Sequence, residues 1–218
     1  MKSFLPTAKE ILTNPNQFFV KDFKKIRSWK EPLTYLAIFT LLATFFLTYH
    51  RAENLKAIAS MNIVGLPGLP SFDVGLTGYI LIYFASAITL ILLTSLKYWV
   101  AHWFVTNYNK KAEFKKTYAV MTYGGTPGWV AIPFFVVGSA LLLGAMTKGG
   151  FLLWLVAIIA SLIWGLLEGY SIYLRITALA KVQKITVLQA VLSVYVFGLL
   201  AYLAIVFIIE ALLIFIVL

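Results

Sequence analysis

The chain has 218 residues, of which 61% are hydrophobic and 12% are charged, and its mean hydropathy is +0.91. An ordinary globular domain carries about twice this share of charged residues, so a soluble fold would have nowhere to bury so much apolar surface. The absence of cysteine excludes disulfides and thiolate sites, and 18 Lys and Arg residues against 8 Asp and Glu residues give a net charge of +10.

Residues 1–31 are rich in charge, and we expect them to form a cytoplasmic amphipathic arm. Asn14 and Pro15 are typical of a helix start, and Gln17 stands where it would complete a capping box. Aromatic and basic side chains then fall on different faces, which predicts a helix in the inner headgroup layer. The alternative is a solvated connector, because Asp22 intrudes on the apolar face. The predicted lipid-facing residues are Phe18, Phe19, Phe23, Lys21, Lys24, Lys25 and Arg27.

Residues 32–218 are predicted to form one five-span membrane domain. Five apolar stretches are each near the ~20 residues that a spanning helix requires. In lipid every backbone polar group needs a partner within the protein, so these stretches predict helices. The expected fold class is all-α, a polytopic bundle of about five spans with an N-terminal amphipathic interfacial helix. The stretches are roughly 33–49, which could continue past Arg51, then 75–100, 118–144, 151–174 and 187–218.

The basic residues are unevenly distributed among the connections, and such a bias sets the orientation of a membrane protein. Only Arg51, Lys56 and Lys148, three of the 18 Lys and Arg residues, lie on the side away from the N-terminus. We therefore expect the N-terminus in the cytoplasm and, after an odd number of spans, the C-terminus outside. Anionic headgroups at the cytoplasmic face would account for the positive charge without nucleic acid.

The third span contains a run of residues that loosen a helix. Glycine is frequent from Gly124 to Gly128, and Pro127 and Pro133 each lack a backbone donor. We expect some carbonyl groups there to lack their ordinary helical partners. Broken segments of this kind bind ions or substrates in transporters. The alternative interpretation is close packing of another helix against the glycines.

The fourth span carries two further patterns. Small residues recur at a spacing of four and predict a ridge for helix packing, formed by Ala157, Ser161, Gly165 and Gly169. Glu168 borders this ridge and is the only acid deep within a span, about 10 Å of helix rise from Arg175. These two residues, with Tyr123 and Pro127, form the candidate intramembrane polar site. Glu168 either binds a cation or proton or clamps two helices through hydrogen bonds.

Catalytic arrangements of side chains are not recognisable in the sequence. His50 and His102 are expected at opposite faces of the membrane, so they cannot share a metal or a catalytic dyad. Neither a serine elbow, nor a zinc-binding helix motif, nor a phosphate-binding glycine loop is present. We therefore expect no enzyme activity, no catalytic residue, no metal and no cofactor.

Three groups of residues follow one another in a recognisable order. The arm contributes Asn14, Pro15, Phe18 and Phe19; the third span contributes Tyr123 and Gly124 with Pro127 and Pro133; the fourth contributes Gly169, Tyr170 and Arg175. This order resembles the Yip family, the Ypt/Rab-interacting membrane proteins. The resemblance implies a five-helix bundle with a cytoplasmic N-terminus. Eukaryotic members are linked to vesicle trafficking and Rab GTPases.

The chain departs from those eukaryotic members, because it has neither their long cytoplasmic domain nor their Asp-Leu-Tyr-Gly-Pro-type motif. It resembles the short prokaryotic branch, which implies an integral protein of a prokaryotic cell membrane and no transfer of Rab binding. The expected function is a non-enzymatic scaffold or adaptor in membrane organisation or trafficking, packing with itself or other membrane proteins. The alternative is a small channel or transporter that uses the broken third span and Glu168.

The predicted orientation can be tested by cysteine labelling, since the chain has no cysteine of its own. Single cysteines at Ser71 and Asn109 should be accessible to a membrane-impermeant thiol reagent from opposite faces, with Asn109 on the cytoplasmic side. Labelling of both positions from one face would contradict the prediction.

Overall fold

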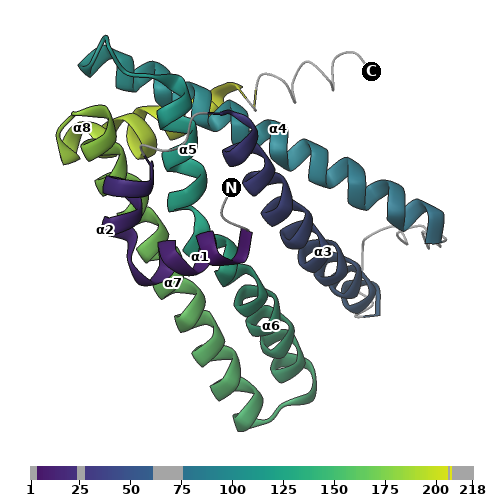
Figure 1. Ribbon diagram of the computed structural model, residues 1–218. Coiled ribbons are helices and arrows are strands. Elements are labelled where there is room, and N and C mark those ends of the chain that lie inside the picture. The colour runs from purple at the N-terminus through teal and green to yellow at the C-terminus, as the bar shows by residue number, and fades with distance from the viewer. Residues whose placement is uncertain (1–3, 24–27, 61–75, 206, 208–218) are drawn as a thin grey trace. The chain divides into compact units, whose positions relative to one another are not determined.

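The computed structural model describes residues 4–23, 28–60, 76–205 and 207, and Figure 1 labels the main helices. The described residues are helical apart from short connections. In chain order the elements are α1 (Phe4–Thr13), α2 (Pro15–Gln17), the π-helical turn η1 (Phe18–Asp22), α3 (Lys30–Ser60), α4 (Leu76–Tyr108), α5 (Phe114–Gly124), α6 (Thr126–Lys148), α7 (Phe151–Gln183), α8 (Val187–Val191) and the π-helical turn η3 (Leu192–Val196).

The all-α fold class and the five predicted spans are confirmed. Within the described residues, five helical segments are long and apolar enough to cross a membrane: Lys30–Thr48, Tyr79–Tyr108, Phe114–Met146, Phe151–Gln183 and Val187–Ile205. The helix of the first span continues to Ser60, past Arg51 as expected. The connection that follows it, 61–75, lies outside the described residues, and Ser71 with it.

The chain divides into two compact units, each assembled from segments far apart in the sequence. Unit 1 comprises Met1–Leu36, Ile91–Thr126 and Ser171–Leu218, and unit 2 comprises Ala37–Leu90 and Pro127–Tyr170. The predicted arm therefore belongs to the same unit as parts of all five spans. All the described Lys and Arg residues that the charge count assigns to the cytoplasmic side fall in unit 1.

Aromatic contacts between apolar helices hold unit 2. Phe39 of α3 stacks on Trp129 of α6 with ring centroids 6.2 Å apart. Phe135 of α6 contacts Trp164 of α7 at 5.4 Å. Each such pair contributes about 0.5–1.5 kcal/mol beyond the area that it buries, so the rings fix the register of these helices.

The core of unit 1 takes side chains from the arm as well as from the spans. Ile11 of α1 is fully buried, as are Leu36 of α3, Met121 of α5 and Leu179 of α7. Full burial of a side chain of this size is worth about 1.5–3 kcal/mol. The arm is therefore held by the hydrophobic effect, in the same way as an internal helix.

A helix begins at Pro15 with Asn14 at its N-cap position, as predicted, but the side-chain cap differs from the prediction. Helix α1 precedes Asn14, whose backbone N–H donates to the carbonyl of Glu10 at 2.8 Å. The Asn14 side chain caps nothing, and the capping box predicted with Gln17 is not formed. The prediction was wrong because α1 already supplies the carbonyl that pairs with the Asn14 backbone, and because the sequence of α1 has no strong start signal.

Candidate functional site

The break predicted in the third span lies between α5 and α6, at Gly125. The carbonyl of Tyr123 would ordinarily accept from residue 127, but Pro127 has no backbone N–H. The hydroxyl of Thr126 donates to this carbonyl instead, at 2.7 Å. A backbone oxygen that the proline deprives of its partner is thus paired by the residue immediately before that proline.

A second carbonyl at the break is paired from another helix. The Gly125 N–H bonds the carbonyl of Thr122 at 3.2 Å. In an unbroken helix this N–H would bond the carbonyl of Met121, so the Met121 carbonyl is left without its helical donor. The hydroxyl of Tyr98 on α4 donates to Met121 at 3.2 Å. Because an unpaired backbone carbonyl away from water costs several kcal/mol, these side-chain donors allow the helix to end inside an apolar segment.

The Thr126 hydroxyl continues the chain of hydrogen bonds toward α3. It lies 2.9 Å from the hydroxyl of Tyr35. Since Thr126 already donates its one proton to the Tyr123 carbonyl, Tyr35 is the donor in this contact. Both tyrosine rings are buried, and their centroids lie 4.8 Å apart.

Aromatic rings from the arm cover the break. Phe4 of α1 contacts Tyr35 at 5.0 Å, and Phe18 of η1 contacts Tyr123 edge-on at 5.3 Å. The rings of Phe4, Tyr35, Tyr123 and Phe18 thus contact one another in this order in space, and we call these four rings the aromatic run. Its two ends come from the arm and its two central rings belong to the first and third spans, so the arm closes the break from one side.

Arg175 of α7 lies against the glycines of the break. A Cβ added to Gly124 would stand 3.0 Å from Arg175 Cγ and 3.2 Å from its Cα, and one added to Gly125 would stand 2.5 Å from Arg175 Nη2. The Gly124 contacts are tighter than nearly all real Cβ contacts and include the Arg175 backbone, so this position leaves little room for a side chain, whereas at Gly125 the 2.5 Å contact is with the movable end of the Arg175 side chain. The glycines therefore serve the close helix approach that was one of the two interpretations of the run.

A polar network ties the ends of three helices together near the break. The Gln183 side-chain amide at the end of α7 donates to the Glu113 carbonyl and to the Thr117 hydroxyl, both at 2.8 Å. The Gln183 carbonyl accepts from Asn109 at 2.6 Å, and Thr117 lies 2.9 Å from His102 Nδ1. Gln183 and Thr117 are buried, so α4, α5 and α7 are joined by satisfied polar groups.

A family model described as the Yip1 domain matches residues 9–208. The chain belongs to the Yip1 domain family. The match covers most of the chain, which confirms the resemblance drawn from the arm and the third and fourth spans. Together with the five apolar helices, it makes the chain a membrane protein of the Yip family. Neither the curated proteins nor the solved structures gave a match.

The four residues of the predicted polar site have different surroundings in this Yip protein. Tyr123 and Arg175 meet at the break, and Pro127 creates one of its freed carbonyls. Glu168 is partly exposed, and within the described part of the chain it makes no hydrogen bond or ion pair. The helix clamp predicted for Glu168 is therefore not formed by the described residues, since none of them offers it a donor.

The small-residue ridge of α7 is only half engaged. Ala157 is buried, and the Ser161 hydroxyl would lie 3.2 Å from a Cβ built on Gly138 of α6. Gly165 and Gly169 are exposed, and a Cβ on either would meet nothing within 4 Å. The described residues therefore show no partner for Gly165 and Gly169, and helix packing at these two glycines stays a prediction, because spacing alone does not say how far along a ridge a neighbouring helix extends.

The phenylalanines of the arm were assigned to the wrong surroundings. Phe18, Phe19 and Phe23 were predicted to enter lipid, but each is at most 7% exposed and packs within unit 1. An amphipathic pattern looks the same whether protein or lipid covers its apolar face. The side chain of Lys21 and all of Lys24, Lys25 and Arg27 lie outside the described residues, so the basic part of the prediction remains a prediction.

Sequence reasoning missed Gln183, Thr117 and Asn109. Each is a single uncharged polar residue at a helix end, where a solvated side chain is the usual interpretation. The predicted topology did contain a signal, because it placed the ends of the second, third and fourth spans at one face. Polar residues meeting at such a common end can bond one another.

The polar network yields a test of stability. Gln183→Leu keeps the side-chain size but removes the hydrogen bonds to the Glu113 N–H and carbonyl and to the buried Thr117 hydroxyl, each worth about 0.5–1.5 kcal/mol. We expect a clearly lower thermal unfolding midpoint in detergent. Gln17→Leu is the matched control, because Gln17 is exposed and its side chain caps nothing. Equal midpoints for the two variants would contradict a structural role for the network.

The same network bears on the labelling experiment. Asn109 donates to the Gln183 carbonyl, so a cysteine there would break a partly buried hydrogen bond. Lys110 is exposed on the same connection and is the better position for the label.

Proposed function

We propose that this Yip protein is a non-enzymatic scaffold or adaptor of the membrane. The observation that carries the proposal is the closure of the broken third span from within. The freed carbonyls of Met121 and Tyr123 accept from Tyr98 and Thr126, and the aromatic run covers them. A break whose two freed backbone carbonyls are already bonded is suited to holding helices in place rather than to binding a passing ion.

The arm supports an adaptor role because it is docked and carries basic residues. Phe18 and Ile11 hold it on unit 1, and the Lys181 ammonium donates to Asn16 of the arm at 3.1 Å. We propose that unit 1, with most of the basic residues of the chain, faces the cytoplasm and contacts anionic headgroups there. The N-terminus would then be cytoplasmic and the C-terminus outside a prokaryotic cell membrane, with no nucleic acid bound.

The exposed part of the α7 ridge supports contact with another membrane helix. Gly165 and Gly169 leave the backbone of α7 open to approach from outside the chain. Transmembrane helices associate at such small residues because their backbones can come close together. The partner would be a second copy of the chain or another membrane protein.

A pair of glycine substitutions tests this surface. Gly165→Leu should leave the thermal midpoint unchanged, because its side chain would extend into open space, but should weaken self-association or partner capture in bicelles. Gly138→Leu is the contrasting variant, since its Cβ would press on Ser161 Oγ at 3.2 Å and Ala160 Cβ at 3.4 Å. It should lower the midpoint. Association that survives Gly165→Leu would remove the ridge from the proposal.

A small channel or transporter remains the second candidate, and Glu168 is the observation that favours it. A carboxylate in the hydrocarbon layer must be protonated, paired or hydrated, and this one has no partner among the described residues. In the scaffold, Glu168 would meet a partner helix or remain protonated.

Two variants of Glu168 distinguish the candidates. For the scaffold, Glu168→Gln and Glu168→Leu should both stay folded with midpoints at or above that of the wild type, because no described donor is stranded. Proteoliposomes of all three proteins should show no ion or proton flux above empty vesicles. Wild-type flux that disappears in a stably folded Glu168→Gln variant would replace the scaffold with a transporter.

A further inference from the structure

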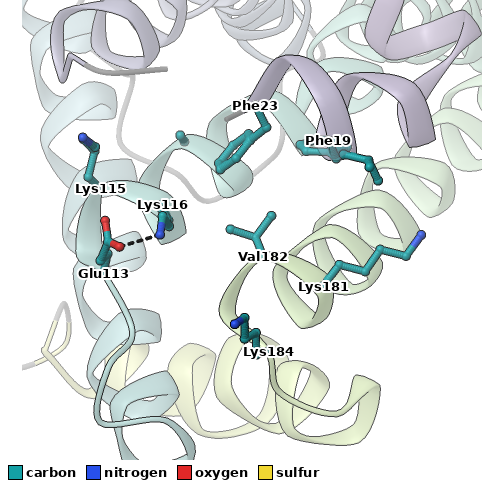
Figure 2. A pocket seen from close by; sticks show the side chains of 10 residues that line it. Phe19, Phe23, Glu113, Lys115, Lys116, Lys181, Val182 and Lys184 are labelled. Atoms are coloured by element: carbon teal, nitrogen blue, oxygen red, sulfur yellow. Dashed lines mark hydrogen bonds and ion pairs between the residues drawn. The ribbon is translucent and has the colours of Figure 1, made fainter. Parts of the chain in front are cut away.

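A cavity of about 690 Å³ opens on unit 1, between the arm, α5 and α7 (Figure 2). Three segments far apart in the sequence form its wall. They contribute Phe19, Val20 and Phe23 from the arm, Glu113, Lys115, Lys116 and Ala119 from the start of α5, and Lys181, Val182 and Lys184 from the end of α7. A volume of this size suits a small organic ligand rather than a single ion.

The lining is strongly cationic. The described residues of the lining include four lysines and one acid, Glu113, and that acid is paired with Lys116 (Figure 2). The hydrogen bond and the charge of Lys116 hold the pKa of the Glu113 carboxyl below its ordinary value, so it stays ionised at neutral pH and offsets only one lysine. A ligand that carries more than one negative charge would match the remaining charge.

The other side of the cavity is apolar. Phe19 and Phe23 are each 7% exposed, and Figure 2 shows them together with Val182 between the lysines of α5 and α7. A freely soluble anion gains nothing from such a wall, whereas the glycerol and first methylenes of a lipid do, at about 0.8 kcal/mol per buried CH₂. The lining therefore suits an amphiphile with an anionic head.

The lysines stand at or just beyond the ends of two candidate spans. The apolar segment of the third span begins at Phe114, and that of the fourth ends at Gln183. Lys115 and Lys116 stand in the first turn of one, and Lys181 and Lys184 stand at the end of the other. Residues at the ends of spanning helices sit at headgroup level.

Lys184 adopts a backbone conformation that favours glycine, with a φ of 54°. The Ile185 N–H bonds the Ala180 carbonyl at 3.0 Å. This hydrogen bond is typical of a helix C-terminus at which the next residue, here Lys184, adopts the left-handed conformation, and that residue is usually glycine. A lysine there is a strained choice that capping does not need, and such strain concentrates at functional positions. Within the described residues its ammonium has no hydrogen bond or ion pair.

We propose that this cavity binds the phosphate of an anionic membrane lipid, with preference for a phosphomonoester head, as in phosphatidic acid, over a phosphodiester. The inference rests on the proposed contact with anionic headgroups and makes it specific: the lysines of α5 and α7 grip the phosphate, and the arm phenylalanines cover the glycerol. A monoester carries about −1.5 to −2 at neutral pH, which suits the excess of lysine better than the single charge of a diester.

Binding to the purified full-length protein in nonionic detergent tests the proposal. The probes are short-chain phosphatidic acid, short-chain phosphatidylglycerol and glycerol 3-phosphate. We expect saturable binding of phosphatidic acid and about tenfold weaker binding of each of the others. Equal affinity for glycerol 3-phosphate would assign the cavity to a soluble phosphate compound, and equal affinity for phosphatidylglycerol would remove the monoester preference; either result overturns the proposal.

Lys184→Gly separates a binding role from a structural one. Glycine accepts a φ of 54° without strain, so the thermal midpoint without ligand should be kept or raised. The affinity for phosphatidic acid should fall about tenfold through the lost charge. Lys110→Gln is the matched control, an exposed lysine outside the cavity lining, and should bind as the wild type does. Unchanged affinity in Lys184→Gly, or an equal loss in Lys110→Gln, would overturn the proposal.

A third variant keeps this inference distinct from the proposed function. Lys24→Gln with Lys25→Gln removes charge from the arm and changes none of the described residues of the cavity lining. If only the proposed contact of the arm with headgroups is wrong, this double variant and the wild type will bind phosphatidylglycerol vesicles alike. Lys184→Gly will still show a lower affinity for phosphatidic acid. If only the proposed lipid site in the cavity is wrong, the double variant will lose vesicle binding, while Lys184→Gly keeps the wild-type affinity for phosphatidic acid.

Discussion

Backbone carbonyl groups inside an apolar segment must be hydrogen-bonded by the protein itself, and this requirement organises unit 1. Gly125 and Pro127 interrupt the third span and free the carbonyls of Met121 and Tyr123. The hydroxyls of Tyr98 and Thr126 then become necessary donors, and Tyr35 completes the set by donating to Thr126. Side chains on three different helices are thereby fixed in orientation by one local defect.

The position of the arm follows from the same defect. The Tyr123 ring, held beside the break, meets Phe18 edge-on, and the Tyr35 ring packs against Phe4 in a tilted arrangement. Docking of the arm in turn places Phe19 and Phe23 opposite the lysines at the ends of α5 and α7. The scaffold role and the proposed lipid cavity therefore depend on one piece of packing, and a substitution at Tyr123 should disturb both.

The spans and the break could be predicted from the sequence because each has a local physical cause. Apolar length decides whether a helix can cross a bilayer, and a missing proline N–H frees a carbonyl in any surroundings. The partner of an apolar face has no such local cause: Phe18 and Phe19 show the same amphipathic pattern toward lipid as toward Tyr123. Gln183 was missed for a related reason, since its bonds to Glu113 and Thr117 join residues that only the fold brings together.

The docking of the arm on Tyr123 also sets an order of events during synthesis. Phe18 leaves the ribosome roughly 100 residues before Tyr123, which at about 5–20 residues per second is a delay of roughly 5–20 s. Throughout that interval the aromatic face of the arm has no protein to cover it, and the membrane surface is the apolar phase nearest to hand. The arm should therefore rest on lipid while the spans are inserted and exchange lipid for protein only when the third span arrives. Its amphipathic sequence thus serves two successive neighbours, first lipid and then the Tyr123 ring.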